Sequence, residues 1–557
     1  MKRVQRYRGL WLLMGLLGLT AVACQLGSIG SADTTNGTVD IPNNAAVVTV
    51  VANNSLVPWL EQAANDFNAT KTETAAEQPV FVIIQGQESG QFITDVASGA
   101  IEPPAIWIPD SPVWTNVLAD QGYNNFQSGC VSVAQSPLVI ATWRTVAESL
   151  GWPGYALGWL DFGSLAQDPS AWNYYTGGDF GESLRLSHTH PGLSGAGAST
   201  LLALVQSAQQ QTQAVSVDEI NLPIVQASVG AFESAVASFA SDPYTLAQTM
   251  QERGTNYLGA AVMYESDVVS NGRGELVPIY PLEGTFVATH PACINAESDQ
   301  EAARLFRDYL LSDEGQVTAV SHALRPVNDN TPTGAPLTAD NGVDLSQPAV
   351  VFGEPSVQTI YAIQDLWQNA RKDVNLVMLL DTSGSMRGSK MDNMREAAVQ
   401  FVAQMGDEDR LTIIAFSTEP YLLVEGVPVG PNRDKLTNAI RDLEASGDTT
   451  LFDAIGDGAT SIERTNNPAM TNALVVLSDG QDTRSYRYRF DQDLVTYVTG
   501  NNTTIFTIAY GNDADEGVLS QLAISGNGNF YRGDEASIAA IYDEMSAAFG
   551  GSVGVGR

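Results

Sequence analysis

The sequence predicts an α/β protein made of two consecutive units, each with a mostly parallel sheet covered by helices. Short apolar runs alternate with helical patterns over most of the 557 residues, which is typical of doubly wound sheets. Polar segments follow several of these runs, at the strand ends where such folds bind ligands. A stretch rich in Pro, Gly, Asn and Asp near residues 328–350 separates the units. A chain of this length exceeds what one hydrophobic core supports.

Residues 1–23 have the features of a secretion signal. A start with four basic residues precedes the apolar run Leu10–Leu19, and Ala21-Val22-Ala23-Cys24 follows. This segment resembles a bacterial lipobox, which implies cleavage before Cys24 and acylation of its thiol. Ala21 departs from the pattern, which more often has leucine there. The alternative is a plain secretory signal with an incidental cysteine. Either reading places the protein outside the cytoplasm, and the first tethers it to the outer face of the cell membrane by lipid.

The net charge argues against nucleic acid as a partner. The formal charge is −36, and loss of residues 1–23 would leave 27 − 4 = 23 basic against 63 acidic residues, a net of −40. Such a surface repels phosphate backbones and anionic headgroups and attracts divalent cations. We therefore expect membrane contact through the lipid alone. Residues 24–44, rich in Gly, Ser, Thr, Asn and Asp, are expected to form a flexible tether.

Two further cysteines, Cys130 and Cys293, lie 163 positions apart. In an exported protein such a pair forms one disulfide or remains as two separate buried thiols. The sequence leaves both alternatives open.

The first unit, residues 45–330, begins with three strand-like runs, Val47–Val51, Val80–Ile84 and Ala105–Ile108. A second α/β block starts at Ser136–Thr142. The order of features resembles that of bilobed bacterial extracellular solute-binding proteins, with Ser136–Thr142 as the strand that crosses between lobes. Ala260–Glu265, Tyr280–Thr285 and Glu301–Gln316 resemble the later strand, the return crossing and the closing helix.

The solute-binding resemblance implies a ligand cleft at the ends of these strands. An anion would be held there by hydroxyls, amides and the helix start after Ser194, whereas a sugar or other small organic molecule would stack on Trp107, Trp114 or Tyr264. For the two tryptophans, a place in the aromatic core is an equally good reading. The expected contacts are Asn54, Ser55, Gln87, Ser89, Asp110, Ser111, Ser194, Gly195 and Tyr264.

The second unit, residues 371–550, follows a linker and lead-in helix expected over 331–370. Val374–Leu380 reads as a strand buried on both faces, and Asp381-Thr382-Ser383-Gly384-Ser385 follows it directly, before a helix over 389–405. Alternate residues of an extended loop point the same way, so Asp381, Ser383 and Ser385 can converge on one point. Their hard oxygens suit a hard divalent ion. Because hydroxyls are neutral, such an ion keeps charge with which to attract a partner's carboxylate.

Asp-x-Ser-x-Ser resembles the first segment of the metal-ion-dependent adhesion site (MIDAS) of von Willebrand factor A (VWA) domains. The family's threonine corresponds to Thr449, or to Thr450 if the register differs by one, and its later aspartate to Asp479 after Ala473–Leu477. The resemblance implies that Ser383, Ser385 and Thr449 hold the metal directly or nearly so, while Asp381 and Asp479 act partly through water. It implies Mg²⁺, with Mn²⁺ or Ca²⁺ as alternatives. The other reading is an inactive domain whose Ser and Asp only cap helices.

Together these features predict a lipid-anchored surface protein that binds a protein partner through a VWA metal and a small ligand through the solute-binding-like unit. The alternative is the solute-binding component of an ABC-type transport system whose VWA domain organises the complex. We expect no enzyme, because the sequence lacks nucleophile-elbow, metalloprotease and phosphate-loop motifs and has only four histidines.

Overall fold

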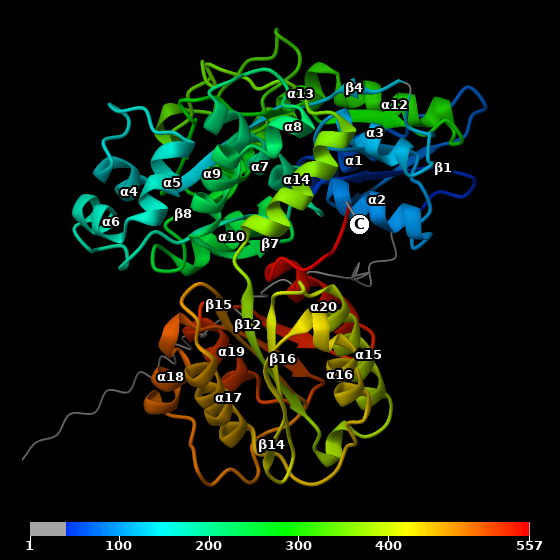
Figure 1. The fold of residues 1–557 in the computed structure, drawn as a ribbon. Helices are drawn as coiled ribbons and strands as arrows, with labels where there is room; N and C mark the ends of the chain where they lie inside the picture. The colour runs from blue at the N-terminus through cyan, green and yellow to red at the C-terminus, as the bar shows by residue number, and fades with distance from the viewer. Residues whose placement is uncertain (1–40, 128, 556–557) are drawn as a thin grey trace, which may run out of the picture.

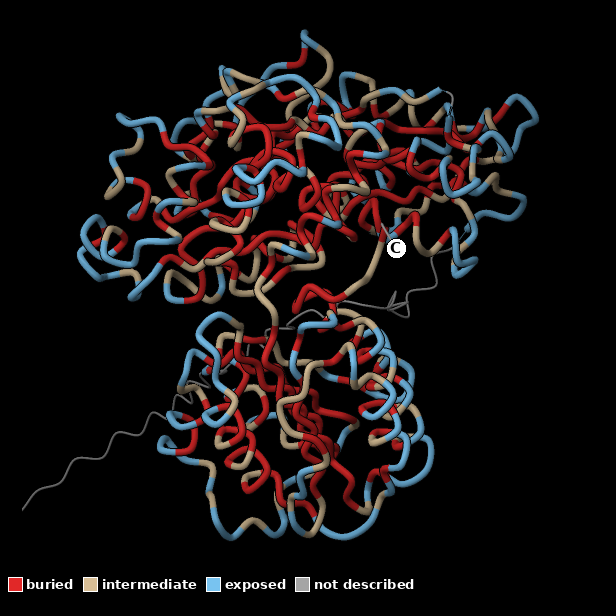
Figure 2. The backbone as a smooth tube through the Cα atoms, viewed as in Figure 1, coloured by how far each residue is buried: buried red, intermediate tan, exposed pale blue. Residues whose placement is uncertain are grey.

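The computed structural model describes residues 41–127 and 129–555, and it contains a bilobed unit joined to a separate α/β unit (Figure 1). Cleavage and lipidation at Cys24, and most of the expected tether, lie outside the described residues. Buried residues run through the centres of both units, along the three sheets (Figure 2). Among the described residues, no helix is both long and apolar enough to cross a membrane. The α/β class and the bilobed arrangement expected from the sequence are confirmed.

Lobe 1 is a five-stranded sheet in the order β2-β1-β3-β11-β4. β1 pairs in parallel with β2 and β3, while β11 is antiparallel to β3 because it comes from the returning chain. Its strands are β1 (Ala46–Ala52), β2 (Val80–Gly86), β3 (Ile106–Ile108), β4 (Val131–Ser132) and β11 (Pro291–Ile294). Its helices are α1 (Val57–Thr70), α2 (Ser89–Ser98), α3 (Val113–Asp120), α12 (Gln300–Leu310) and α13 (Asp313–Ser321), with a 3-10 turn η1 (Asn54–Leu56).

Lobe 2 is a six-stranded sheet in the order β10-β5-β8-β6-β7, with β9 paired to β5 beside this path. Its strands are β5 (Ser136–Trp143), β6 (Leu186–Thr189), β7 (Val236–Ala240), β8 (Ala260–Tyr264), β9 (Leu276–Ile279) and β10 (Val287–Ala288). Its helices are α4 (Arg144–Ser149), α5 (Trp159–Gln167), α6 (Pro169–Thr176), α7 (Gly195–Gln209), α8 (Val217–Ile220), α9 (Pro223–Glu233), α10 (Pro243–Arg253) and α11 (Glu265–Asn271). The chain enters this lobe at β5, as the crossing expected at 136–142 requires.

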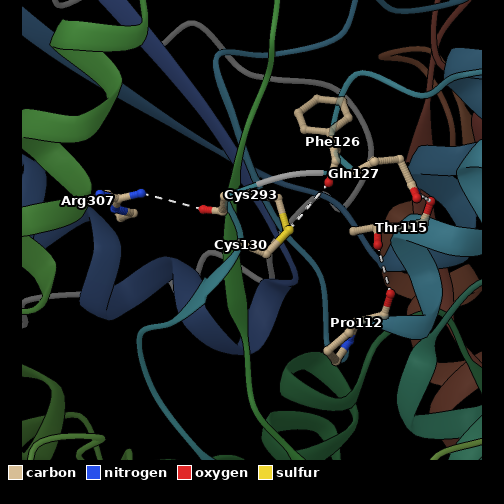
Figure 3. Close-up of a disulfide and its surroundings, with 8 residues drawn as sticks. Pro112, Thr115, Phe126, Gln127, Cys130, Cys293 and Arg307 are labelled. Atoms are coloured by element: carbon tan, nitrogen blue, oxygen red, sulfur yellow. Dashed lines mark hydrogen bonds between the residues drawn. A yellow bond between two sulfur atoms is a disulfide. The ribbon is translucent and has the colours of Figure 1, made fainter.

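A disulfide between Cys130 and Cys293 ties the loop before β4 to β11 (Figure 3). The two residues are 163 positions apart, and β11 belongs to the chain that returns from lobe 2. The bond therefore links the outgoing and returning segments of lobe 1, and the pairing left open by the sequence is decided in favour of a disulfide.

The segment between the units is packed rather than free. Leu337, Val343 and Phe352 are buried, and Thr285 of lobe 2 forms a parallel bridge with Val351. Helix α14 (Val357–Ala370) then contacts α3 of lobe 1 and α7, α8 and α9 of lobe 2, so it lies across the junction of the lobes (Figure 1). The lead-in helix expected within 331–370 is present as α14, and the linker before it has apolar residues buried against the bilobed unit.

The second unit has a six-stranded sheet in the order β14-β13-β12-β15-β16-β17, parallel except for the edge strand β14. Helices cover both faces, which explains why all of β12 is buried. Its strands are β12 (Val374–Asp381), β13 (Arg410–Phe416), β14 (Pro420–Pro428), β15 (Thr471–Ser478), β16 (Thr504–Tyr510) and β17 (Phe530–Gly533). Its helices are α15 (Ser389–Gln404), α16 (Val429–Arg441), α17 (Leu451–Thr465), α18 (Gln492–Val498), α19 (Glu516–Ser525) and α20 (Ile538–Ala548).

The chain after α20 runs from the second unit to the bilobed unit (Figure 1). There it docks on the loop of residues 190–193 in lobe 2. Val555 N donates to Gly192 O at 2.8 Å, and a ring nitrogen of His190 lies 2.9 Å from Gly551 O. Leu193 O in the same loop accepts from the backbone N–H of Gly90, in lobe 1, at 2.8 Å. This loop of lobe 2 thus contacts lobe 1 on one side and the C-terminal tail on the other.

Candidate functional site

The candidate metal site lies at the carboxyl end of the VWA sheet. β12 and β15 are parallel neighbours that end at Asp381 and Ser478, so the loops after them emerge side by side. Asp381 and Asp479 are fully buried, whereas Ser385 is exposed. Ser385 therefore lies at the surface of the site, with Ser383, Thr449 and the two carboxylates buried behind it.

Asp381 organises the floor of this site. Its Oδ1 accepts from the backbone N–H of Ser383 at 2.8 Å, and its Oδ2 accepts from Ser478 Oγ at 2.7 Å. Burial is the main influence on this carboxyl and raises its pKa to about 6, although the hydrogen bonds from Ser383 and Ser478 oppose the rise. A nearby cation would favour the ionised form.

Three side chains carry oxygens toward one point above Asp381. The hydroxyls of Ser383 and Ser385 are 3.0 Å apart, and Ser385 Oγ donates to Asp479 Oδ1 at 2.7 Å. The other carboxylate oxygen of Asp479 forms an ion pair with Lys390 Nζ, also at 2.7 Å. The lysine lies near the start of α15 and supplies the positive charge beside these oxygens.

Thr449 completes the set, and the ambiguity with Thr450 is resolved. A Cβ placed on Gly480 would lie 3.8 Å from Thr449 Oγ1 and 3.9 Å from Ser385 Oγ, so the two hydroxyls flank the same small space. Thr450 Oγ1 instead donates to Ser417 O at 3.0 Å. The five residues predicted from the sequence are therefore brought together, with Thr449 in the site. Two carboxylates and three hydroxyls form a donor set that fits a hard divalent cation.

Polar residues in the bilobed unit converge on Asp110 at the interface of the lobes. Asn53 Nδ2 donates to Asp110 Oδ1 at 2.8 Å, Tyr264 OH donates to the same oxygen at 2.7 Å, and Ser89 Oγ donates to Oδ2. A Cβ on Gly195 would lie 2.1 Å from Asp110 Oδ2, so only glycine permits this approach of the carboxylate to the start of α7.

The other residues expected to contact a solute, Asn54, Ser55, Ser111 and Ser194, lie at the lobe interface or beside it. Ser55 Oγ donates to Asp267 Oδ2 at 3.0 Å, and the Asn54 backbone N–H donates to Glu88 Oε1 at 3.1 Å. Ser194 is fully buried at the start of α7. Ser111 lines a cavity of about 20 Å³ beside Asp110.

In this cleft the structure places Gln87 differently from the expectation and decides between the two alternatives left open for Trp107. Gln87 is turned away, since its amide contacts Asp95 of α2, and its neighbour Glu88 faces the interface instead. Trp107 stacks on Phe92 with ring centroids 4.4 Å apart and no exposed surface, so it belongs to the core. Trp114 and Tyr264 do line the cavity beside Asp110.

Sequence reasoning missed Asn53, Glu88, Asp242 and Asp267. Asp242 and Asp267 lie at the N-terminal ends of α10 and α11, where an acidic residue reads as an ordinary helix cap, and Asp242 does accept from Thr245 N at 2.8 Å. Their position after β7 and β8 was the signal that could have found them.

Comparison with family models divides the chain into the same two units as the fold. The model of the bacterial extracellular solute-binding proteins matches residues 48–325, and that of the von Willebrand factor type A domain matches residues 375–544. Inter-alpha-trypsin inhibitor heavy chain H4 of Sus scrofa is 24% identical over 188 residues, which are 32% of this chain and 20% of that protein. The Synechocystis sp. protein sll0103 is 24% identical over 193 residues, 35% of this chain and 44% of that protein. The chain thus spans less than half the length of these curated relatives.

Solved structures are similar to each part. The periplasmic binding protein AfuA from Actinobacillus pleuropneumoniae, with fructose-6-phosphate bound, shares 14% identity, covers 58% of this chain and 98% of its own, and has a TM-score of 0.42. A von Willebrand factor type A protein from Catenulispora acidiphila shares 20% identity over 32% of this chain and 43% of its own, with a TM-score of 0.29. By the two family models, the chain contains a bacterial extracellular solute-binding domain over residues 48–325, followed by a VWA domain over residues 375–544.

Proposed function

We propose that this protein is a lipid-anchored surface binding protein with two binding sites. The VWA domain binds a protein partner through a divalent cation, and the bilobed module binds a small solute. The solute-binding family indicates an extracytoplasmic location. We propose a binding role rather than catalysis, because the described polar clusters place no nucleophile against a general base in an accessible site.

The convergence of Asp381, Ser383, Ser385, Thr449 and Asp479 at one end of the sheet carries the proposal for the VWA domain. These residues would hold Mg²⁺, with Mn²⁺ or Ca²⁺ as weaker alternatives. A bound cation would supply a Lewis-acidic position for a partner's carboxylate. The chain's own contribution is to place three neutral hydroxyls together, with Ser385 at the surface, so that a cation held mainly by them would keep charge for a partner's carboxylate.

Calorimetric titration of the chain from residue 25 with Mg²⁺ and Mn²⁺ tests the metal. We expect one site that Ser383→Ala abolishes, because this removes a ligand oxygen. Ser389→Ala is the matched control, since Ser389 is exposed on α15 and outside the oxygen cluster. Equal metal binding by the Ser383 and Ser389 variants would refute the site.

The partner class is tested on an array of immobilised extracellular proteins. We expect binding that a chelator removes, Mg²⁺ restores and Asp381→Ala eliminates. Binding that persists in the chelator would show that any partner is held without the metal.

The lipid anchor is tested in the producing cell. Labelling with a fatty-acid analogue should tag the wild-type chain, and Cys24→Ser should leave it untagged and released from the membrane. A tagged Cys24→Ser protein would exclude this cysteine as the attachment point.

A further inference from the structure

Four carboxyl groups face one another at the interface of the two lobes. Glu88 and Asp110 come from lobe 1, at the ends of β2 and β3, and Asp242 and Asp267 come from lobe 2. All four residues are at most 2% exposed. Among the residues that the structure describes, no lysine or arginine forms an ion pair with any of them. Burying several ionised carboxyls together costs free energy unless a positive charge lies beside them. Because the described residues supply none, a bound solute could supply it.

Most of the hydrogen-bonding capacity left at this interface consists of carboxyl and amide oxygens, beside which the Ser194 hydroxyl and the His290 ring are also without a partner among the described residues. Within the described residues, Glu88 Oε2, Asp267 Oδ1 and Asn53 Oδ1 are buried without a hydrogen-bond partner. Without a cation these carboxyls keep protons, whereas a solute with N–H donors and a positive charge would both ionise them and use their free oxygens. Burial, together with the neighbouring acids, also raises the pKa of Glu88 well above its usual value and that of Asp267 to about 8.

The N-terminal end of α7, where an anion could have been held, is already occupied by a carboxylate of the protein. The Asp110 carboxylate lies against Gly195 at the first turn of α7, so its negative charge takes the favourable position at the positive end of that helix. An anionic solute would meet four acids and no free helix start. The expectation that hydroxyls and amides hold an anion here is therefore disfavoured.

We propose that the lobe interface binds a solute bearing ammonium groups, an amine or polyamine; this rests on the proposed function of the module as a solute binder. N–H donors spread along such a molecule match acceptors that come from both lobes. A single metal ion fits less well, because no three acidic, His or Cys residues in the described part of the chain are placed to share one ion. The lobes must separate to admit a solute, since the cavity beside Asp110 is about 20 Å³, room for about one water.

The experiment is calorimetric titration of the chain from residue 25 with putrescine and spermidine, and in separate arms with glucose, inorganic phosphate and Mg²⁺. Asp242→Asn and Asp267→Asn should each weaken amine binding by at least about tenfold, because each removes a carboxyl that a bound ammonium group would hold in its ionised form. Asp66→Asn, on the exposed face of α1, makes the same charge change outside the cleft and should leave binding unaltered. Circular dichroism and melting temperature confirm that each variant folds.

The outcomes separate this proposal from the one on which it rests. Glucose or phosphate binding that the cleft variants alter, without amine binding, would overturn the ammonium class and preserve solute binding. Amine binding that Asp66→Asn weakens as much as Asp242→Asn would be general attraction to an acidic surface and would also overturn it. No binding of putrescine, spermidine, glucose or phosphate would overturn the ammonium class, and a wider screen of small molecules without any ligand would then count against the solute-binding function itself. Mg²⁺ binding that Asp242→Asn or Asp267→Asn weakens would place a metal in the cleft and would also overturn the ammonium class.

Discussion

At the scale of single residues, two adjacent threonines have different tasks. Thr449 Oγ1 flanks the same space as Ser385 Oγ, while Thr450 Oγ1 donates to a backbone carbonyl. The loop backbone sets where each side chain points, so a shift of one residue along the chain exchanges a hydroxyl of the oxygen cluster for a structural hydrogen bond.

We therefore expect Thr449→Val to weaken Mg²⁺ binding by about 10-fold or more, and Thr450→Val to leave it nearly unchanged while lowering stability by about 1 kcal/mol. Titration calorimetry and denaturant unfolding measure the two effects. The reverse pattern would place Thr450 in the site.

Lys390 would compete with the proposed cation for Asp479. Its ammonium lies 2.7 Å from Asp479 Oδ2, and its side chain is only 26% exposed. Lys390→Met removes this positive charge, so we expect Mg²⁺ to bind about fivefold more tightly, on the order of 1 kcal/mol. Weaker binding would show instead that the lysine is needed to position Asp479.

The interface acids predict a pH dependence of stability. Burial raises the pKa of Asp267 from 3.8 to about 8, and Glu88 and Asp242 shift in the same direction, with Asp110, Ser55 and Tyr264 as their neighbours. The folded state then holds protons that the unfolded state has released. The contribution of Asp267 is complete below about pH 4 and is lost as pH rises toward 8.

Without an added solute, the melting temperature should therefore fall between pH 5 and 8. Asp267→Asn should reduce that fall, because the amide has no proton to lose, whereas Asp66→Asn should reproduce the wild-type profile. Scanning calorimetry at a series of pH values measures this. Identical profiles for wild type and Asp267→Asn would exclude Asp267 as a source of the dependence.

At the scale of secondary-structure elements, lobe 1 is assembled from chain segments that are far apart in sequence. β11 pairs with both β3 and β4, although the whole of lobe 2 intervenes in the chain. The disulfide between Cys130 and Cys293 reinforces this junction (Figure 3).

Replacing both cysteines by serine should destabilise lobe 1 by about 2–5 kcal/mol, because the bond restricts a long loop in the unfolded chain. Urea unfolding followed by tryptophan fluorescence measures the loss, with reductant on the wild type as an independent check. Unchanged unfolding in both experiments would show that strand pairing alone holds the junction.

At the scale of the whole molecule, the loop of residues 190–193 connects three parts. It accepts a hydrogen bond from lobe 1 through Leu193 O, it binds the C-terminal tail through Gly192 O, and Gln364 of α14 donates to Pro191 O at 2.7 Å. This arrangement gives a physical route by which opening of the lobes would disturb the end of the VWA unit.

Gly192→Ala should release the tail, since a Cβ there would lie 2.5 Å from Val553 O. We expect a lower melting temperature and faster amide exchange at residues 551–555. Gly163→Ala, where a Cβ meets nothing within 4 Å, is the matched control and should not loosen the tail. Unaltered exchange in Gly192→Ala would show that the tail is held by other contacts.

The sequence by itself determined the α/β class, the two-unit order and the oxygen cluster of the VWA domain. These follow from local rules, because an apolar run such as Val374–Leu380 makes a buried strand and the alternate residues after it point the same way. Asp381, Ser383 and Ser385 are consecutive alternate positions, so their convergence needs little information from elsewhere in the chain.

The tertiary structure alone decided which side chains meet across long separations. Glu88 rather than Gln87 faces the lobe interface, Asp242 and Asp267 join it from the other lobe, Trp107 enters the core, and residues 331–370 pack on the bilobed unit. Each of these positions depends on the direction in which a turn points a side chain, or on which element packs against a given surface. Sequence periodicity specifies which face of an element is apolar, but the long-range packing of the two lobes determines what that face meets.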